Sequence, residues 1–257
     1  MDLGLRGKVA AVTGGSRGLG RAIALRLAAE GCAVAICARS EAALETAAEE
    51  LRGHGVAVHA AVADVTQAGA VEQFVDESAA ALGGLDLLVA NVGGSAGEGL
   101  LESTPEDWLR TFDLNLFHAV RAVRAAAPHM VRRGGGSAAI VASISGWKPG
   151  PRAQYGTAKA GEIFLAGALA WELGPQRIRV NAVSPGSIFF PGGGWDRFQA
   201  QHPERFAEFE RREFPWQRLG RPDEVADAVA FVLSERASWI NGANIPVDGA
   251  QGRPSAF

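Results

Sequence analysis

Short runs of consecutive aliphatic residues alternate with longer amphipathic segments along most of the chain. The amphipathic segments have apolar residues at helical spacing and cover 19–29, 41–52, 68–82, about 105–133 and 155–173. The aliphatic runs lie at 9–12, 33–37, 56–61, 85–90, 138–141, 178–182 and 244–247. Apolar strands that alternate with helices are typical of a parallel sheet buried on both faces. The pattern therefore predicts an α/β fold with a doubly wound parallel sheet of about seven strands and helices on both faces.

One segment, from 184 to 220, interrupts this alternation with a cluster of aromatic residues. These are Phe189, Phe190, Trp195, Phe198, Phe206, Phe209, Phe214 and Trp216. A connection of this length inside a compact domain is usually functional. The aromatic content predicts a packed lid at about 187–218. No linker or repeat divides the rest of the chain, so we expect 1–257 to form a single domain.

Composition and charge exclude several classes of protein. The chain has 257 residues, 47% of them hydrophobic and 21% charged, with a formal net charge of −3. Without a basic field we expect no nucleic-acid partner, and without a run of about 18 apolar residues we expect no membrane span. Cys32 and Cys37 lie too close together to staple a loop, so we expect reduced, buried thiols. Asp2 stands where a secretory signal has basic residues, so we expect a cytoplasmic protein.

A glycine-rich turn follows the first predicted strand. Residues 13–20 read Thr-Gly-Gly-Ser-Arg-Gly-Leu-Gly and lead directly into the first predicted helix. Glycines in this position let the backbone approach a dinucleotide pyrophosphate, which binds at the helix N-terminus. The turn therefore predicts a dinucleotide-binding Rossmann fold. The cofactor-binding candidates in it are Gly14, Ser16, Arg17, Gly18, Leu19 and Gly20.

The end of the second predicted strand indicates which nicotinamide cofactor the turn accepts. An acid there would bind the adenosine ribose hydroxyls and repel a 2′-phosphate. The chain instead has Cys37-Ala38-Arg39-Ser40. The guanidinium of Arg39 can stack on adenine and bind the phosphate, and Arg17 offers a second guanidinium. We therefore expect NADP(H), with NAD(H) the less favoured alternative.

A phenol and an ammonium group lie four residues apart at Tyr155 and Lys159, which places them on one helix face. A phenol acts as an acid or base near neutral pH only if a neighbouring cation stabilises its phenolate. Lys159 can supply that charge. Two serines, Ser143 and Ser145, follow the preceding strand at its carboxyl end, where open α/β sheets bind ligands.

These motifs together resemble those of the short-chain dehydrogenase/reductase family, including its 3-oxoacyl carrier-protein reductase-like members. The resemblance extends from about Lys8 to Asp248 and includes the wide glycine spacing and the Tyr-x-x-x-Lys pair. It implies a catalytic set of Asn115, Ser143, Tyr155 and Lys159. Ser143 is preferred because Gly146 then completes the family's Ser-x-x-Gly, and Ser145 remains the rival assignment.

The resemblance also implies a role for each of these residues. Ser143 would hydrogen-bond the substrate oxygen, Tyr155 would protonate it, Lys159 would bind the nicotinamide ribose and stabilise the phenolate, and Asn115 would anchor a water chain. The chain departs from the family's Asn-Asn-Ala-Gly turn at Val92 and Gly93. The further cofactor positions that the resemblance implies are Asp64, Val65, Asn91, Gly93, Tyr155, Lys159, Pro185, Gly186 and Ile188.

The predicted activity is hydride transfer between NADP(H) and a small-molecule carbonyl or secondary alcohol, and a ketone reductase is the preferred hypothesis. The alternatives are an oxoacyl-thioester reductase, an NAD-dependent polyol or sugar dehydrogenase, and a regulatory protein that binds the cofactor without chemistry. We expect no metal. The resemblance implies a homotetramer, with Trp171, Trp239 and Phe257 as candidate contacts.

Overall fold

The computed structural model describes residues 2–253, and its centre is one sheet of seven parallel strands in the order β3-β2-β1-β4-β5-β6-β7. The strands are β1 Val9–Thr13, β2 Ala33–Ala38, β3 Val58–Val62, β4 Leu87–Ala90, β5 Gly136–Val141, β6 Ile178–Pro185 and β7 Asn244–Val247. This confirms the predicted α/β fold. The strand order reverses between β1 and β4, where open α/β sheets bind ligands at the carboxyl ends of their strands.

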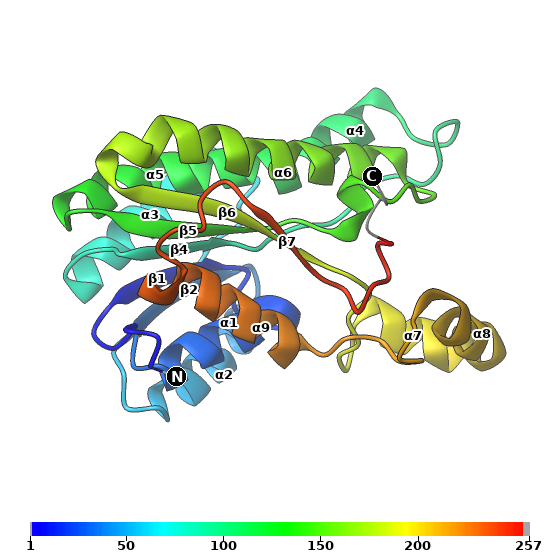
Figure 1. The fold of residues 1–257 in the computed structure, drawn as a ribbon, viewed down its shortest axis with the longest axis horizontal. Coiled ribbons are helices and arrows are strands. Elements are labelled where there is room, and N and C mark those ends of the chain that lie inside the picture. The colour runs from blue at the N-terminus through cyan, green and yellow to red at the C-terminus, as the bar shows by residue number, and fades with distance from the viewer. Residues whose placement is uncertain (1, 254–257) are drawn as a thin grey trace.

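Helices cover both faces of this sheet, as Figure 1 shows. Alternate side chains of each strand pack against α1, α2 and α9 on one face and against α3, α5 and α6 on the other. These helices are α1 Gly18–Ala29, α2 Glu41–Arg52, α3 Ala70–Leu82, α5 His118–Arg132, α6 Ala153–Leu173 and α9 Pro222–Leu233. Strands β1, β2 and β4 are almost continuously apolar because both of their faces are buried, whereas β6 carries the polar residues Arg179, Asn181 and Ser184.

The structure differs from the predicted elements in two places. The helix expected over 105–133 consists of α4, Pro105–Phe112, and α5, joined by a π-helical turn, η1, at Asp113–Phe117. Helix α9 was not predicted, although Val225, Ala226, Val229 and Ala230 are all buried and have helical spacing. The irregular sequence just before it obscured this signal.

The aromatic segment forms two further helices, α7 Gly194–Gln201 and α8 Pro203–Glu213. Its side chains pack mainly on one another. Phe206, Phe214 and Leu219 are buried in this cluster, and the Trp195 ring stacks on Phe209 with centroids 4.4 Å apart. We call α7 and α8 the lid helices. They fold around a small core of their own beside the main sheet.

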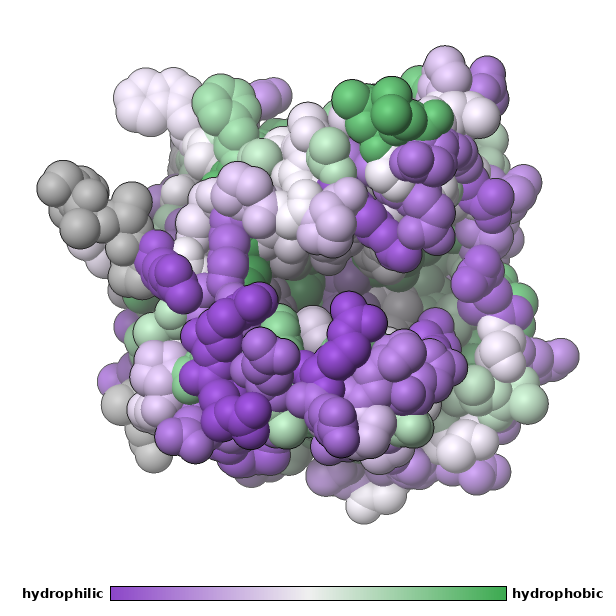
Figure 2. Space-filling model, turned by 90° about the vertical axis from the view of Figure 1, so that its right-hand side faces the viewer, coloured by the Kyte–Doolittle hydropathy of each residue, from purple (hydrophilic) through white to green (hydrophobic). Residues whose placement is uncertain are grey.

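Figure 2 shows the face that carries the lid helices, which is hollowed between them and the segment that carries α4. The lid side of the hollow is mostly hydrophilic, whereas hydrophobic side chains gather above it, over the loop before α4. Leu100 and Leu101 are exposed in that loop. Within residues 2–253 no helix has the length and apolar character needed to cross a membrane.

Candidate active site

In the glycine turn after β1, the start of α1 lies very close to the backbone that leaves the strand. Gly14 and Gly18 adopt left-handed φ values of +68° and +55°, which favour glycine. A Cβ on Gly20 would lie 2.2 Å from the carbonyl oxygen of Gly14. The turn therefore accepts no side chain at Gly20 without moving. This cradle fits the pyrophosphate site expected from the sequence, and Ser16, Arg17 and Leu19 lie in the same turn.

Asn91 holds the turn after β4 against the glycine turn. Its Nδ2 donates to the carbonyl oxygen of Thr13 at 2.9 Å, and its backbone N–H donates to Thr13 Oγ1 at 3.0 Å. The next glycine brings two catalytic candidates together. A Cβ on Gly93 would lie 2.8 Å from Asn115 Oδ1 and 2.9 Å from Lys159 Nζ. A side chain at position 93 would therefore press on the ends of these two side chains.

Asn115 lies in the π-helical turn η1 and is fully buried. Its Nδ2 donates to the carbonyl oxygens of Thr111 at 2.6 Å and Gly94 at 2.7 Å, and its Oδ1 accepts the Gly94 N–H at 3.2 Å. Helices bulge in this way mostly at functional sites. The side chain of Asn115 thus fixes the backbone that follows β4.

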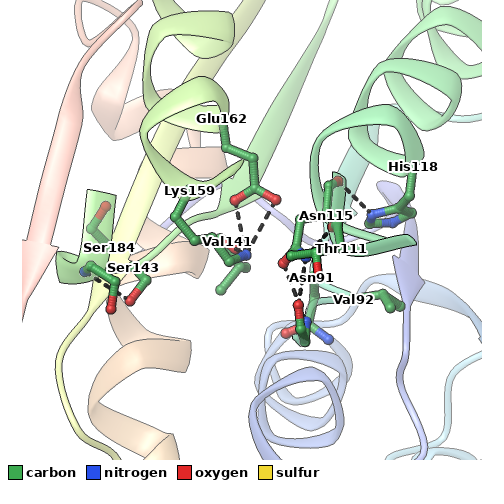
Figure 3. A network of polar contacts seen from close by, with 12 residues as sticks. Asn91, Val92, Thr111, Asn115, His118, Val141, Ser143, Lys159, Glu162 and Ser184 are labelled. Atoms are coloured by element: carbon green, nitrogen blue, oxygen red, sulfur yellow. Dashed lines mark hydrogen bonds and ion pairs between the residues drawn. The ribbon is translucent and has the colours of Figure 1, made fainter. Parts of the chain in front are cut away.

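Tyr155 and Lys159 occupy one face of the first turns of α6. Lys159 Nζ lies 5.7 Å from the centroid of the Tyr155 ring. The ammonium donates to the carbonyl oxygen of Val141 at 2.9 Å and to Glu162 Oε2 at 2.9 Å, as Figure 3 shows. Burial disfavours the charge of Lys159, but the charges of Glu162 and Tyr155 and the hydrogen bond to Glu162 together outweigh that effect, so the pKa of Lys159 is raised. Burial raises the pKa of Glu162, and Lys159 opposes that rise.

The two candidate serines lie at the end of β5, in the turn that packs against α6. Ser143 caps a short 3₁₀ turn, η2 Ile144–Gly146, and its Oγ accepts the Ser145 N–H at 3.1 Å. Both serines are half-buried. A Cβ on Gly146 would lie 3.1 Å from the backbone nitrogen of Ala160, so this turn lies directly against the helix of Tyr155 and Lys159.

The two candidate phosphate-binding arginines follow paired strand ends. Thr13 of β1 is in register with Cys37 of β2, and Arg17 and Arg39 follow these residues on exposed loops. Between residues 2 and 253, neither guanidinium forms an ion pair or a hydrogen bond with another side chain. Both guanidinium groups are therefore exposed and able to contact an anion.

Asp64 and Val65, the candidate adenine contacts, follow β3 at the same corner of the sheet. The N–H and the hydroxyl of Thr66 donate to Asp64 Oδ1 at 3.0 and 2.8 Å, and these bonds hold the pKa of Asp64 below its usual value. The carbonyl oxygen of Val65 accepts from Arg121 Nη2 at 2.9 Å. The backbone that would meet adenine is thus tied to α5.

The turn after β6 is held by the C-terminal part of the described chain. The Ser187 N–H donates to Gln251 Oε1 at 2.7 Å, and Gln251 Nε2 donates back to Ser187 Oγ at 2.9 Å. A Cβ on Gly186 would lie 2.7 Å from the same Gln251 oxygen. Pro185 ends β6, and the side chain of Ile188 is buried in the core beside α1 and α9. Only the backbone of Ile188 is therefore open to a cofactor.

A cavity of about 690 Å³ separates the glycine turn from the lid helices. Arg17 and Gly18 line one side of it, and Phe189, Phe190 and Phe206 line another. The ring of Phe190 packs directly on Gly18. A Cβ atom added to Gly18 would lie 2.9 Å from this ring. The Phe190 ring therefore covers the glycine turn from the side of the cavity.

The basic residues between Ser143 and Tyr155 have protein partners. Lys148 Nζ donates to the Glu213 carboxylate, at the end of α8, and to the carbonyl oxygen of Gln251 at 2.8 Å. Arg152 is exposed and pairs with Glu98 at 3.5 Å. Lys148 therefore joins the lid helices to the body of the protein. Both Lys148 and Arg152 contact acidic side chains of the chain itself.

Three buried polar residues at this site were not predicted. Glu162 pairs with Lys159, Gln251 holds Ser187, and His118 lies behind Asn115. Burial lowers the pKa of His118 to about 3, so its ring is neutral. A polar residue at an otherwise apolar helix position was the available sequence signal for Glu162 and His118.

The candidate subunit contacts are on the surface. Trp171 at the end of α6 and Trp239 before β7 are 89% and 99% exposed, which excludes a core role for either ring in the single chain. Phe257 lies outside the described residues. Cys32 and Cys37 are buried and free, as predicted. In the described part of the chain, no group of three or more histidine, cysteine or acidic side chains is arranged to hold a metal ion.

Comparisons with known proteins cover nearly the whole chain. A family model described as enoyl-(acyl carrier protein) reductase matches residues 14–250. Dehydrogenase/reductase SDR family member 4 from Homo sapiens is 36% identical over 253 residues, which make up 98% of this chain and 89% of that protein.

Two solved structures with bound cofactors are also similar to this chain. L-sorbose reductase from Gluconobacter frateurii, complexed with NADPH and L-sorbose, has a TM-score of 0.91 at 33% identity, covering 97% of this chain and 98% of that one. A 7α-hydroxysteroid dehydrogenase, complexed with NADH and 7-oxo glycochenodeoxycholic acid, has a TM-score of 0.89 at 28% identity, covering 96% and 95%. These neighbours bind different cofactors and different substrates.

Proposed function

Because the chain belongs to the short-chain dehydrogenase/reductase family of oxidoreductases, we propose that it transfers a hydride between NADP(H) and a carbonyl or secondary alcohol substrate, acting as a ketone reductase. One observation carries the proposal. The ammonium of Lys159 is buried next to Asn115 and 5.7 Å from the ring centroid of Tyr155, the only tyrosine of the chain. A buried cation beside a phenol is the arrangement that lets the phenol transfer a proton.

Each catalytic residue has one task in the proposed reaction. Nicotinamide, when bound, supplies or accepts the hydride at the substrate carbon. In reduction, Tyr155 gives its phenolic proton to the carbonyl oxygen, so the carbonyl gains a hydride and a proton and becomes an alcohol. The Ser143 hydroxyl donates a hydrogen bond to the same oxygen, and the positive charge of Lys159 favours the phenolate that remains. Alcohol oxidation reverses these steps.

The cofactor would lie across the carboxyl ends of β1, β2 and β4. The glycine turn would receive the pyrophosphate, and the turn that contains Asn91 and Gly93 would approach the nicotinamide ribose. Arg17 and Arg39 support NADP(H) over NAD(H), because both are exposed and no acid ends β2. A 2′-phosphate gives two guanidinium groups a charge partner that an unphosphorylated ribose lacks.

The proposed setting is a cytoplasmic homotetramer that acts on a small molecule, without nucleic acid or membrane. Buried free thiols support the reducing compartment. Exposed apolar side chains on η1, α5 and α6 support association through these elements. They are Phe117, Val120, Val131, Phe164 and Trp171. Large exposed apolar side chains often mark protein interfaces when they gather in one patch.

A thioester reductase is the second candidate, favoured by the matching family description. Its carrier-protein form would use Arg132 and Arg133 as anchors. The structure gives both arginines partners within the chain, because Arg132 donates to His129 at 2.6 Å and Arg133 to Asp86 at 3.2 Å. These surface contacts are weak, so the turnover test below is what separates a carrier protein from a free small molecule.

The test is a titration of the purified protein with NADPH and NADH, followed by turnover against ketones, oxoacyl thioesters and sugars. Tighter NADPH binding with consumption on a ketone would support the proposal. Faster turnover of thioesters would favour the second candidate, and turnover of sugars or polyols with NAD(H) would favour a dehydrogenase of that class. Tight binding without turnover on any compound would favour a regulatory protein.

A further inference from the structure

Glu162 is a buried acid one helical turn after Lys159, and the proposed reaction does not use it. Both side chains are only 2% exposed. Glu162 Oε2 and Oε1 lie 2.9 and 3.2 Å from Lys159 Nζ, and the carbonyl oxygen of Val141 accepts from the same ammonium at 2.9 Å. Figure 3 shows the carboxylate pointing toward Nζ from the next turn of α6. The three ammonium protons thus face three oxygens of the chain itself.

Stability alone does not explain this pair. Moving two charges out of water costs free energy that their mutual attraction repays only partly, and apolar residues of similar volume often stabilise such a site as well or better. Lys159 is buried beside Tyr155, and Glu162 compensates its charge there. Because Lys159 Nζ lies 5.7 Å from the centroid of the Tyr155 ring, any change in the charge of this pair also acts on that phenol.

The net charge next to Tyr155 decides how readily its phenol loses a proton. A lone ammonium favours the phenolate, whereas an ammonium paired with a carboxylate favours it less. We propose that Glu162 is a positioning residue that orients the Lys159 ammonium and offsets part of its charge, so that Tyr155 keeps a larger share of its proton-donating phenol form. This rests on the proposed function and deepens it, because a protonated phenol is the form that carbonyl reduction consumes.

Other titratable groups on the elements packed against α6 are neutral, paired or exposed. His118 on α5 is neutral, since burial lowers its pKa to about 3. Asp113 and Arg121 pair with each other at 2.8 Å. On α4, Asp107 accepts the Thr104 N–H at 3.0 Å.

The remaining charged side chains near α6 also have partners or face solvent. Glu106 and Arg110 on α4 are exposed. Lys148 after η2 pairs with Glu213, and Arg179 on β6 donates to carbonyl oxygens.

The chain offers a direct spectroscopic readout, because Tyr155 is its only tyrosine. The absorbance of tyrosinate in the apo protein therefore reports the ionisation of this one phenol, without cofactor or substrate. Tyr155→Phe gives the blank that removes the contribution of tryptophan. Titrations would be confined to the pH range in which the far-ultraviolet circular dichroism of each protein is unchanged.

Three variants separate charge from structure. Glu162→Gln keeps the shape and an oxygen acceptor for Lys159 but removes the negative charge. Glu162→Asp keeps the charge. Glu172→Gln makes the same chemical change at an exposed position of the same helix and serves as the matched control.

We expect Glu162→Gln to move the tyrosinate midpoint down by about one pH unit, as expected when a neighbouring charge is removed. Glu162→Asp should return it toward the wild-type midpoint, and Glu172→Gln should leave it unchanged. The acid limb of the pH profile for alcohol oxidation should move in the same direction in Glu162→Gln. A midpoint that stays in place or moves up in Glu162→Gln would overturn the proposal, even if activity falls. Absence of turnover in the wild type would count against the proposed function alone, because the tyrosinate titration uses neither cofactor nor substrate.

Discussion

The ring of His118 joins the end of β1 to the helical turn that carries Asn115. His118 Nε2 lies 2.9 Å from the hydroxyl oxygen of Thr13, and Nδ1 lies 3.3 Å from the carbonyl oxygen of Asn115. A carbonyl oxygen only accepts, so Nδ1 carries a proton. Burial lowers the pKa of His118 to about 3 and keeps the ring neutral, which leaves Nε2 to accept from the Thr13 hydroxyl.

His118 should make the protein sensitive to acid. Burial lowers its pKa from 6.5 to about 3. Below pH 6.5 His118 binds a proton in the unfolded chain, whereas in the folded chain it stays neutral until about pH 3. The free energy of unfolding therefore falls as the pH falls from 6.5 to about 3. The loss is about 1.4 kcal/mol per pH unit. Chemical unfolding at several pH values should show a shallower slope for His118→Gln than for the wild type.

His54 provides the control for this measurement, because it is exposed. His54→Gln should retain the wild-type slope. If His118→Gln retained it as well, the acid sensitivity would have to come from other groups.

Gly93→Ala should damage catalysis more than folding. The added methyl group would meet Asn115 Oδ1 at 2.8 Å and Lys159 Nζ at 2.9 Å, so the ammonium must move. Displacing a catalytic group by about 1 Å can cost roughly 100-fold in rate. We expect kcat to fall by about that factor, with a modest fall in Tm by calorimetry. Gly150→Ala, where nothing lies near the added methyl, is the control, and wild-type turnover in Gly93→Ala would show that Lys159 need not stay in place.

The two serines after β5 can be distinguished by a matched pair of variants. Ser143→Ala removes the hydroxyl assigned to the substrate oxygen, and the loss of one such donor costs about 100-fold to 1,000-fold in kcat. Ser145→Ala leaves its backbone N–H in place and should change kcat much less. Steady-state kinetics on both variants decides the assignment. A larger loss in Ser145→Ala would transfer the role to Ser145.

Arg39→Ala should weaken NADPH far more than NADH. A charge-assisted hydrogen bond contributes about 1.5–3 kcal/mol, so the Kd for NADPH should rise by roughly 10-fold to 100-fold. Fluorescence titration with each cofactor gives both constants. Arg6→Ala removes the same charge from an exposed site before β1 and should change neither. Equal weakening of both cofactors by Arg39→Ala would argue against 2′-phosphate recognition.

The sequence predicted the sheet because central strands such as β2 and β4 are buried and continuously apolar. It predicted the positions of Tyr155, Lys159 and the glycine turn because these depend on short spacings. The π-helical turn at Asp113–Phe117 was missed, since one extra residue barely alters the helical period. Glu162 and His118 were missed because their roles depend on distant partners, and Thr13 lies 105 residues from His118. The helices α7 and α8 were not predicted, because their aromatic residues pack on one another and not against the main sheet.

The central claim is that Tyr155 transfers the proton in a nicotinamide-dependent reaction. The most direct test compares wild type and Tyr155→Phe in NADPH binding and in NADPH consumption with a ketone that the wild type reduces. We expect Tyr155→Phe to bind NADPH with nearly the wild-type Kd and to lose about 100-fold to 10,000-fold in kcat, the usual contribution of a general acid. Turnover by Tyr155→Phe at the wild-type rate would contradict the claim.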